Sequence, residues 1–369
     1  MAPPEDVRVR CDRRGALRLL GATAGAGALS VFGRHADVLA AIGQVTGSRS
    51  SAVSFPKGAI VRTVLKDVSP ESLAGGPVLF HEHLSMHYPP QAKEHFTDDV
   101  AMMVEEVRAA AKAGVACIVD GGHPDMTRSL DALKRIAAES GMPVVGSGGY
   151  YMQRTYPPEI ATQSADQIAE SLVREATAQH LGAFGEIGQQ SGVLTDDEKK
   201  VFQAVAKAQA RTGLPIFTHN AYTGVRSTPN PVPPEAALRQ LDVLEGAGAT
   251  PEHVAIGHVC CLDDPKALVA QQVARRGAFV GFDRVTIPIV PDAERVVMIL
   301  AMVEAGYADR VLISSDFAMA ASLKKNGGAG LAQTSTVFGP MLLEAGLSET
   351  LLHQMLVDNP RRFLAFVPK

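Results

Sequence analysis

Short apolar segments alternate with longer amphipathic segments along most of this 369-residue chain, and this rhythm constrains the fold more than any other feature. Each apolar segment is rich in β-branched or aromatic residues, which is typical of a strand. The segments between them repeat apolar residues at spacings of three and four, and most end in glycine, which is typical of amphipathic helices. The eight predicted strands are residues 77–83, 116–121, 143–148, 183–188, 215–219, 253–258, 278–283 and 311–316.

A strand that is followed by a helix and then by another strand builds a parallel sheet. Eight such units predict an α/β protein with a (β/α)8 TIM barrel, because an open doubly wound sheet more often has about five to seven strands and a glycine-rich first turn. No G-x-G-x-x-G motif follows the first predicted strand. We also expect a short hairpin within residues 59–77, which would cap the lower end of the barrel, and a terminal helix with a closing segment within residues 348–366.

The first forty residues differ from the rest of the chain. Arg13 and Arg14 precede an Ala/Gly/Leu-rich run, and small residues follow near Ala40. This pattern is typical of a twin-arginine export signal, although Ala16 stands where such signals often carry phenylalanine. We expect residues 1–40 to be the signal, 41–57 a linker and 58–369 the barrel. The apolar run is too short for a stable membrane span, so we expect a periplasmic or secreted protein. The alternative is a disordered or membrane-tethered N-terminus.

Charge and composition exclude some classes of partner. The net charge is -4, tryptophan is absent and aromatic residues make up only 5% of the chain. Neither a basic footprint nor a stacking platform for nucleic acid is present. Of the four cysteines, Cys11 lies in the expected signal, which leaves three in the mature chain. We expect these three to be buried free thiols, because the adjacent Cys260 and Cys261 could pair with each other only under strain.

The stretch "VLFHEHL", residues 78–84, places two histidines in an apolar strand. Strict alternation puts Leu79, His81 and His83 on one face of the strand, and Phe80 and Glu82 on the other. Glu82 would then point toward the helices, where it would support the ligands or pack. Taken alone, the two histidines are equally well explained as half-buried residues whose hydrogen bonds are made with the backbone.

Other predicted strands also end in polar residues, and the carboxyl ends of the strands form the active-site rim of a barrel. If these residues were purely structural, each buried polar group would need its own hydrogen-bond partner. A buried group without a partner lowers the stability of the fold by about 1–3 kcal/mol. A shared divalent metal site would satisfy all of them at once. The six candidate ligands are His81, His83, Glu186, His219, His258 and Asp316.

Several motifs in order along the chain carry a family resemblance. The sequence resembles the phosphotriesterase-related family of the amidohydrolase superfamily, in particular its phosphotriesterase homology protein-like branch, from about residue 60 to residue 366. The motifs include "HEHL" at 81–84, "GEIG" at 185–188, "FTHN" at 217–220, "IGHV" at 256–259, "SSDF" at 314–317 and "DNPRRFLAF" at 358–366.

The resemblance implies two divalent metal ions, with zinc expected first and manganese, iron or cobalt as alternatives. Bacterial phosphotriesterases bridge their metals with a carboxylated lysine, whereas this chain offers Glu186. That departure favours the homology-protein branch and weakens the expectation of efficient organophosphate turnover. By the resemblance, His81, His83 and Asp316 would hold the more buried ion, His219 and His258 the more exposed ion, and Glu186 would bridge them.

The implied reaction is hydrolysis of a small molecule with an ester, lactone or amide bond, with phosphotriesters as a secondary substrate. A hydroxide that bridges the metals would be the nucleophile, and Asp316 would be the catalytic proton acceptor. Two alternatives stay open. A superfamily deaminase usually carries one metal and a His-x-Glu on a middle strand, whereas residues 218–220 read "THN" here. A periplasmic ligand-binding protein could keep the fold without turnover.

Five weaker candidates for substrate contact lie after predicted strands. Each has a plain structural alternative: packing for the tyrosines, a loop residue for the histidine and a surface position or salt bridge for the two cations. Family members are often homodimers, and the sequence itself offers no information on assembly. The candidates are Tyr150, Tyr151, His123, Arg284 and Lys324.

Overall fold

The computed structural model of the protein describes residues 53–87, 97, 99–221, 232–287 and 290–369. The predicted export signal and most of the predicted linker lie outside the described residues. Among the described helices, none combines the length and the apolar character that a membrane crossing requires.

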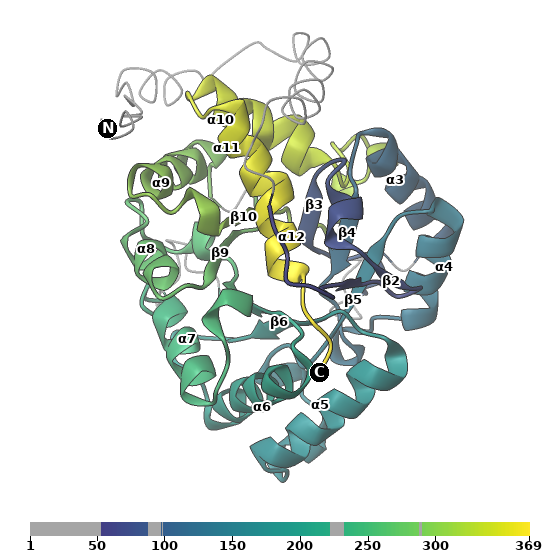
Figure 1. Ribbon diagram of the computed structural model, residues 1–369, viewed down its shortest axis with the longest axis vertical. Coiled ribbons are helices and arrows are strands. Elements are labelled where there is room, and N and C mark those ends of the chain that lie inside the picture. Colours follow the sequence, from purple (N-terminus) through teal and green to yellow (C-terminus); the bar gives the residue numbers. More distant parts are fainter. Residues whose placement is uncertain (1–52, 88–96, 98, 222–231, 288–289) are drawn as a thin grey trace.

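Eight parallel strands form a nearly closed barrel that is surrounded by helices (Figure 1). The strands pair in chain order, so the predicted TIM barrel and all eight predicted strands are confirmed. The strands are β3 Val78–Glu82, β4 Cys117–Asp120, β5 Val144–Gly148, β6 Ala183–Gly188, β7 Ile216–His219, β8 Val254–Ile256, β9 Phe279–Phe282 and β10 Val311–Ile313. Five strands end earlier than predicted. The difference is largest for β8 and β10, which end two and three residues early, and His258 and Asp316 after them adopt positive φ angles of 56° and 49° that do not continue an extended backbone.

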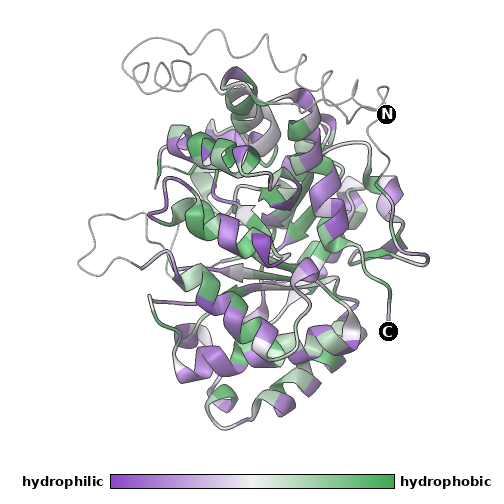
Figure 2. Cartoon of the chain, turned by 60° about the vertical axis from the view of Figure 1, so that its left-hand side comes forward, coloured by the Kyte–Doolittle hydropathy of each residue, from purple (hydrophilic) through white to green (hydrophobic). Residues whose placement is uncertain are grey.

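The helices follow from local signals in the sequence. Ser164 and Thr195 cap two of them with side-chain hydrogen bonds to the first turn, and Gly213 ends the second of these in the left-handed conformation. Figure 2 shows hydrophilic and hydrophobic residues side by side along the helices, as their amphipathic patterns predict. The helices are α3 Val100–Lys112, α4 Leu130–Ser140, α5 Ala165–Gln179, α6 Asp196–Thr212, α7 Ala236–Gly246, α8 Leu268–Arg275, α9 Asp292–Glu304, α10 Gly339–Glu344, α11 Glu349–His353 and α12 Asn359–Leu364.

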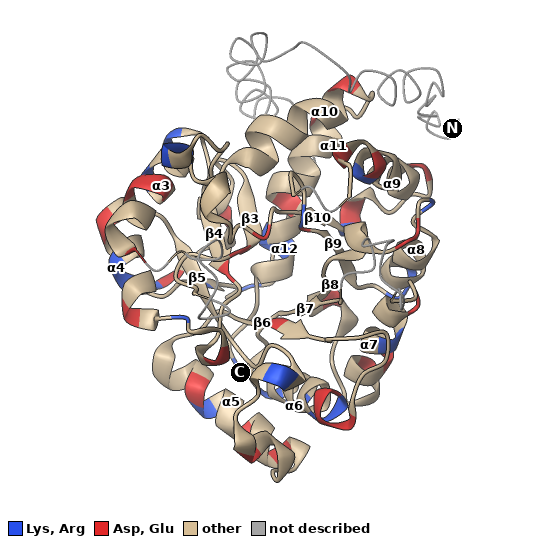
Figure 3. Ribbon diagram, turned by 180° about the vertical axis from the view of Figure 1, so that it is seen from behind, with Lys and Arg blue, Asp and Glu red and all other residues tan. Residues whose placement is uncertain are grey.

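One end of the barrel is closed by packing. Phe80 and Phe279 make edge-to-face contacts with Phe363 of α12, with ring centroids 6.2 and 5.7 Å apart. The predicted hairpin is confirmed as the antiparallel pair β1 Val61–Arg62 and β2 Asp67–Val68. Figure 1 shows α12 across this end of the barrel, and Figure 3 shows acidic residues near the centre of the ring when the molecule is seen from behind. Because this end is closed, a functional site is expected at the opposite rim, where the carboxyl ends of the strands lie.

Strand β3 departs from the strict alternation that the sequence predicts. Its register with β4 shifts between Leu79 and Glu82. The rings of Phe80 and His81 both contact Phe217 inside the barrel, at centroid distances of 6.4 and 5.0 Å, while Leu79 packs in the layer of the helices. The prediction that Leu79 shares a face with His81 is therefore wrong, because the irregularity re-aims the side chains that follow it.

Candidate metal centre

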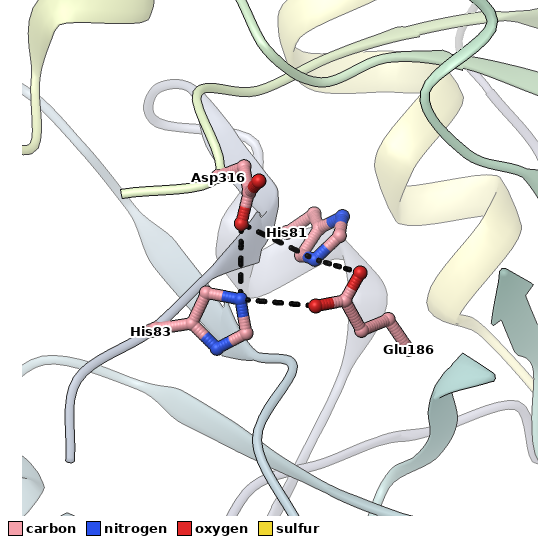
Figure 4. Close-up of side chains that lie close together, drawn as sticks. All are labelled: His81, His83, Glu186 and Asp316. Atoms are coloured by element: carbon pink, nitrogen blue, oxygen red, sulfur yellow. Dashed lines mark ion pairs between the residues drawn. The ribbon is translucent and has the colours of Figure 1, made fainter. Parts of the chain in front are cut away.

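His81, His83, Asp316 and Glu186 point toward one another at the carboxyl rim of the barrel (Figure 4). His83 Nε2 lies 3.0 Å from Asp316 Oδ1 and 3.3 Å from Glu186 Oε1. His81 Nε2 lies 3.5 Å from Glu186 Oε2. We call His81, His83 and Asp316 the β3–β10 half of the site, since they lie in or directly after these two strands.

The second group comes from the other side of the ring. His219 ends β7 and His258 follows β8, and we call these two residues the β7–β8 half. Glu186 Oε2 lies 2.8 Å from His219 Nδ1 and 3.3 Å from His258 Nε2. The carboxylate of Glu186 thus touches both halves.

Glu186 reaches this position through a second irregular strand. The register of β6 with β7 shifts between Phe184 and Ile187, and both of these side chains pack in the outer apolar layer. Glu186 is 2% exposed and lies between them in the chain, on the inner side. As in β3, the shift turns a polar side chain toward the centre.

The donor set fits divalent cations. One ligand atom from each of His81, His83, Glu186 and Asp316 lies within 4.8 Å of the others, and the same holds for Glu186, His219 and His258. Imidazole and carboxylate together suit zinc and related transition metals. The Nε2 atom of His81 is fully buried and has no hydrogen-bond partner in the described residues, as expected for an atom that binds a metal.

Asp283 orients one histidine from each half. Its Oδ2 accepts a hydrogen bond from His81 Nδ1 at 2.9 Å, and its Oδ1 accepts from His258 Nδ1 at 3.0 Å and from the His258 backbone N–H at 2.7 Å. With Nδ1 of both rings occupied by Asp283, Nε2 of both rings faces the centre. The sequence analysis did not include Asp283 among the site residues, although its place directly after an apolar strand was a usable signal.

The histidines of the site differ in their electrostatics, and His219 is the one whose pKa is lowered. Burial lowers the pKa of His258, but the charge of Asp283 and the hydrogen bonds to Asp283 and Glu186 outweigh it and raise the pKa to about 9. Burial lowers the pKa of His83, but hydrogen bonds to Asp316 and Glu186 outweigh it and raise the pKa to about 10. Burial also lowers the pKa of His219, and here the attraction of Glu186 is insufficient, so the pKa falls to about 4. Burial opposes ionisation of Glu186, yet the neighbouring His219 and His81 hold the pKa of this carboxyl well below its usual range.

Two of the five weaker candidates lie beside these ligands. The hydroxyl of Tyr151 is 3.3 Å from His219 Nδ1. Arg284 Nη1 is 3.3 Å from Asp316 Oδ2, and the side chains of both Arg284 and Asp316 are 9% exposed. These two candidates are therefore within reach of a molecule that is bound at the centre.

The other three candidates make their described contacts with residues other than the six proposed ligands. Tyr150 packs edge-to-face on Tyr156, with ring centroids 6.1 Å apart. His123 is buried, with Nδ1 3.3 Å from Asp125 Oδ1. Lys324 has an exposed side chain in the segment after β10. Within the described residues no hydrogen bond or ion pair joins these three to the six proposed ligands, and their contact with substrate stays a prediction.

Comparison with known proteins identifies relatives along nearly the whole barrel. The phosphotriesterase family matches this chain over residues 60–364. The phosphotriesterase homology protein of Escherichia coli is 30% identical over 297 residues, which are 78% of this chain and 97% of that protein. A crystal structure of that protein with phosphate in its active site has a TM-score of 0.71 and 29% identity, and covers 79% of this chain and 99% of that chain.

Two further similar proteins have names that state an activity. The N-acetyltaurine hydrolase of Xenopus tropicalis is 27% identical over 357 residues, and the match covers 83% of this chain and 98% of that protein. The crystal structure of a lactonase from Listeria monocytogenes has a TM-score of 0.73 and 27% identity, with 83% of this chain and 99% of that chain covered. Both of these relatives are hydrolases, and the bonds they cut differ.

Proposed function

This chain belongs to the phosphotriesterase family of metal-dependent hydrolases, and we propose that it uses two divalent metal ions, zinc first, to cleave a carboxylic ester, lactone or amide. The observation that carries the proposal is the Glu186 carboxylate, whose oxygens lie 2.8 Å from His219 in one half and 3.3 Å from His83 in the other. A carboxylate shared by two sets of imidazoles is the arrangement that a bridged pair of cations requires.

Each residue would have a distinct task. His81, His83 and Asp316 would hold one ion and His219 and His258 the other. Two bound ions would supply a water of lowered pKa and polarise the carbonyl oxygen of the substrate. Asp316 would accept the proton that this water gives up. Burial opposes ionisation of Asp316, but the Arg284 guanidinium keeps its pKa below the usual range, so the side chain is a carboxylate that can take a proton.

The bond class is proposed from the named relatives. One relative hydrolyses an N-acyl amide and another a lactone, so both bond types are candidates for this chain. A phosphotriester would be a secondary substrate, because Glu186 stands where bacterial phosphotriesterases carry a modified lysine. The deaminase alternative predicts release of ammonia, and the binding-protein alternative predicts tight ligand binding without any product.

The decisive experiment combines metal analysis with a substrate panel. We expect about two zinc ions per chain, and lactone, ester or N-acyl amide hydrolysis that a chelator abolishes. Asp316→Asn should lower kcat on the order of 10²–10⁴-fold while much of the metal stays bound, because it removes the proton acceptor but keeps an oxygen ligand. Metal binding without turnover on any of these classes would reject the hydrolase mechanism, and a wild-type rate in Asp316→Asn would reject its role.

We also propose that the chain is exported by the twin-arginine route to the periplasm or beyond. The support is the Arg13-Arg14 pair ahead of an apolar, glycine-rich run. Replacing both arginines with lysine should retain the protein in the cytoplasm, as measured by cell fractionation. We propose a homodimer only because members of the family are often homodimers. Analytical ultracentrifugation of the mature protein would test it.

A further inference from the structure

Glu82 is the last residue of β3, a fully buried carboxylate between His81 and His83 that accepts four hydrogen bonds. Its Oε1 accepts from Ser314 Oγ at 2.7 Å and from the Ser315 backbone N–H at 3.0 Å. Its Oε2 accepts from Ser315 Oγ at 2.8 Å and from the Phe317 backbone N–H at 2.7 Å. All four donors belong to the segment 314–317, which includes Asp316.

These hydrogen bonds cross the place where the barrel closes. The ladder of paired strands begins at β10 and ends at β3, and no ladder between β10 and β3 occurs in the described part of the chain. Two backbone hydrogen bonds also cross there, from His83 N–H to Phe317 O at 3.0 Å and from Asp316 N–H to His81 O at 3.1 Å. The seam of the barrel is therefore also the place where the β3–β10 half of the site is assembled.

The chemistry of the four donors requires a carboxylate. Each oxygen of Glu82 receives one backbone N–H, from Ser315 or from Phe317. A glutamine in either orientation would direct its NH₂ group at a backbone N–H, which cannot accept a hydrogen bond. The serine hydroxyls can rotate to suit either partner, but the backbone donors cannot. A buried donor that loses its acceptor costs about 1–3 kcal/mol.

We propose that Glu82 is the positioning residue of the β3–β10 half: it fixes segment 314–317 at the seam and thereby holds the Asp316 carboxylate beside His83. Asp316 needs such support, because its φ of 49° lies in the left-handed region that most residues avoid. The consequence for metal binding rests on the proposed function, whereas the consequence for the backbone does not.

Glu106 provides a matched control. It is also a buried carboxylate, and each of its oxygens likewise accepts a backbone N–H, from Lys324 at 3.0 Å and from Leu331 at 3.1 Å. It therefore holds residues 324–331, which follow segment 314–317 in the chain and include none of the six proposed ligands. Glu106→Gln creates the same conflict between donors as Glu82→Gln without touching segment 314–317.

The test measures two quantities in the full mature chain. The first is amide hydrogen exchange of the metal-free protein: Glu82→Gln should speed exchange in peptides covering residues 314–317, and Glu106→Gln in peptides covering 324–331 instead. The second is zinc release to a chelator, together with the visible absorption of the cobalt-loaded protein. We expect Glu82→Gln to release one of two ions about 10–100-fold faster and to alter the cobalt spectrum, with Glu106→Gln close to wild type.

The outcomes separate the two proposals. Unchanged exchange at 314–317 in Glu82→Gln, or equal metal loss in both variants, would overturn the positioning role. A wild-type protein that binds no metal would reject the proposed function, and exchange would still decide the role of Glu82. If Glu82→Gln does not fold, Ser315→Ala removes one of the four donors and leaves Ser314, whose hydroxyl also accepts from the His81 backbone N–H at 3.1 Å. This variant should still speed exchange at 314–317; unchanged exchange there would overturn the inference.

Discussion

One histidine from each half of the site, His83 and His219, shows that the same residue type can lie in opposite electrostatic settings. In the β3–β10 half, two carboxylates contact His83, which raises its pKa to about 10 despite its burial. In the β7–β8 half, His219 and His258 share one oxygen of Glu186. Burial lowers the pKa of His219 to about 4, whereas Asp283 overcomes the effect of burial on His258 and raises its pKa to about 9. The balance of neighbouring carboxylates and histidines therefore decides whether a buried imidazole carries a proton before a metal arrives.

The halves also differ in their support. In the β3–β10 half, Glu82 accepts hydrogen bonds from the backbone N–H groups of Ser315 and Phe317, which join the two strands at the barrel seam. The β7–β8 half has the hydroxyl of Tyr151 beside His219. Asp283 is common to both halves, since each of its oxygens contacts one histidine ring. Substitution of Glu186 or Asp283 therefore acts on both halves, whereas substitution of His83, His219 or Tyr151 acts on one.

Glu186→Gln should have the largest effect, because it removes the charge that both halves share. We expect loss of at least one of the two metal ions and a fall in kcat/KM on the order of 10³-fold or more, since paired metals are needed to activate the water. Metal content by mass spectrometry and turnover of the best substrate would be compared with wild type. Retention of both ions at wild-type affinity would show that the halves do not depend on a shared carboxylate.

Asp283→Asn should weaken both halves to a smaller extent. An asparagine has one acceptor oxygen, so it can orient His81 or His258 but not both. Loss of such support typically costs about 10–100-fold in metal affinity or activity. Calorimetric titration with zinc would show whether one or both binding steps weaken. A single weakened step would reveal which histidine the remaining oxygen prefers, and unchanged titration would contradict the orienting role.

The opposite pKa shifts predict opposite pH effects on the stability of the metal-free protein. The pKa of His83 is raised above 6.5, so its stabilising contribution is complete below pH 6.5 and is lost as the pH rises through about 10. The pKa of His219 is lowered, so its contribution is present above pH 6.5 and is lost as the pH falls through about 4. Melting temperatures of chelated protein from pH 4 to 10 should fall toward both ends.

Single substitutions separate the two arms of this pH profile, which are the fall in melting temperature at acid pH and the fall at alkaline pH. His219→Asn should flatten the acid arm and leave the alkaline arm, while His83→Asn should do the reverse, because each variant removes one titrating imidazole. Other groups titrate in both ranges, so the comparison with wild type is the informative quantity. Equal changes on both arms in either variant would show that the pKa values of His83 and His219 are not set separately.

Tyr151→Phe should have the smallest effect. The variant keeps the ring contact with His219 and removes only the hydroxyl, which lies 3.3 Å from His219 Nδ1. One lost hydrogen bond corresponds to about 0.5–1.5 kcal/mol, or roughly 2–12-fold in kcat/KM, with metal content unchanged. Tyr150→Phe is the control, because Tyr150 packs on Tyr156 instead. Equal losses in the two variants would count against a specific role for the Tyr151 hydroxyl.

The sequence by itself determined the barrel and the six polar residues at its rim. Strands and helices can be predicted because the spacing of their apolar residues repeats over a few positions. The carboxyl ends of parallel strands meet at one rim of the barrel, whatever the length of the segments between them. His219 shows this clearly: it ends β7 and lies beside Glu186, as its place in the strand predicts. Roles at the metal ions came from the family resemblance and stay predictions.

Only the tertiary structure decided how individual side chains are aimed. The register shifts in β3 and β6 turn His81 and Glu186 inward, and simple alternation cannot locate such shifts. Asp283 contacts His81 across 202 positions of sequence, and Glu82 contacts the Ser315 backbone across 233. A buried carboxylate takes its role from the donors that surround it, and those donors come together only when the barrel closes.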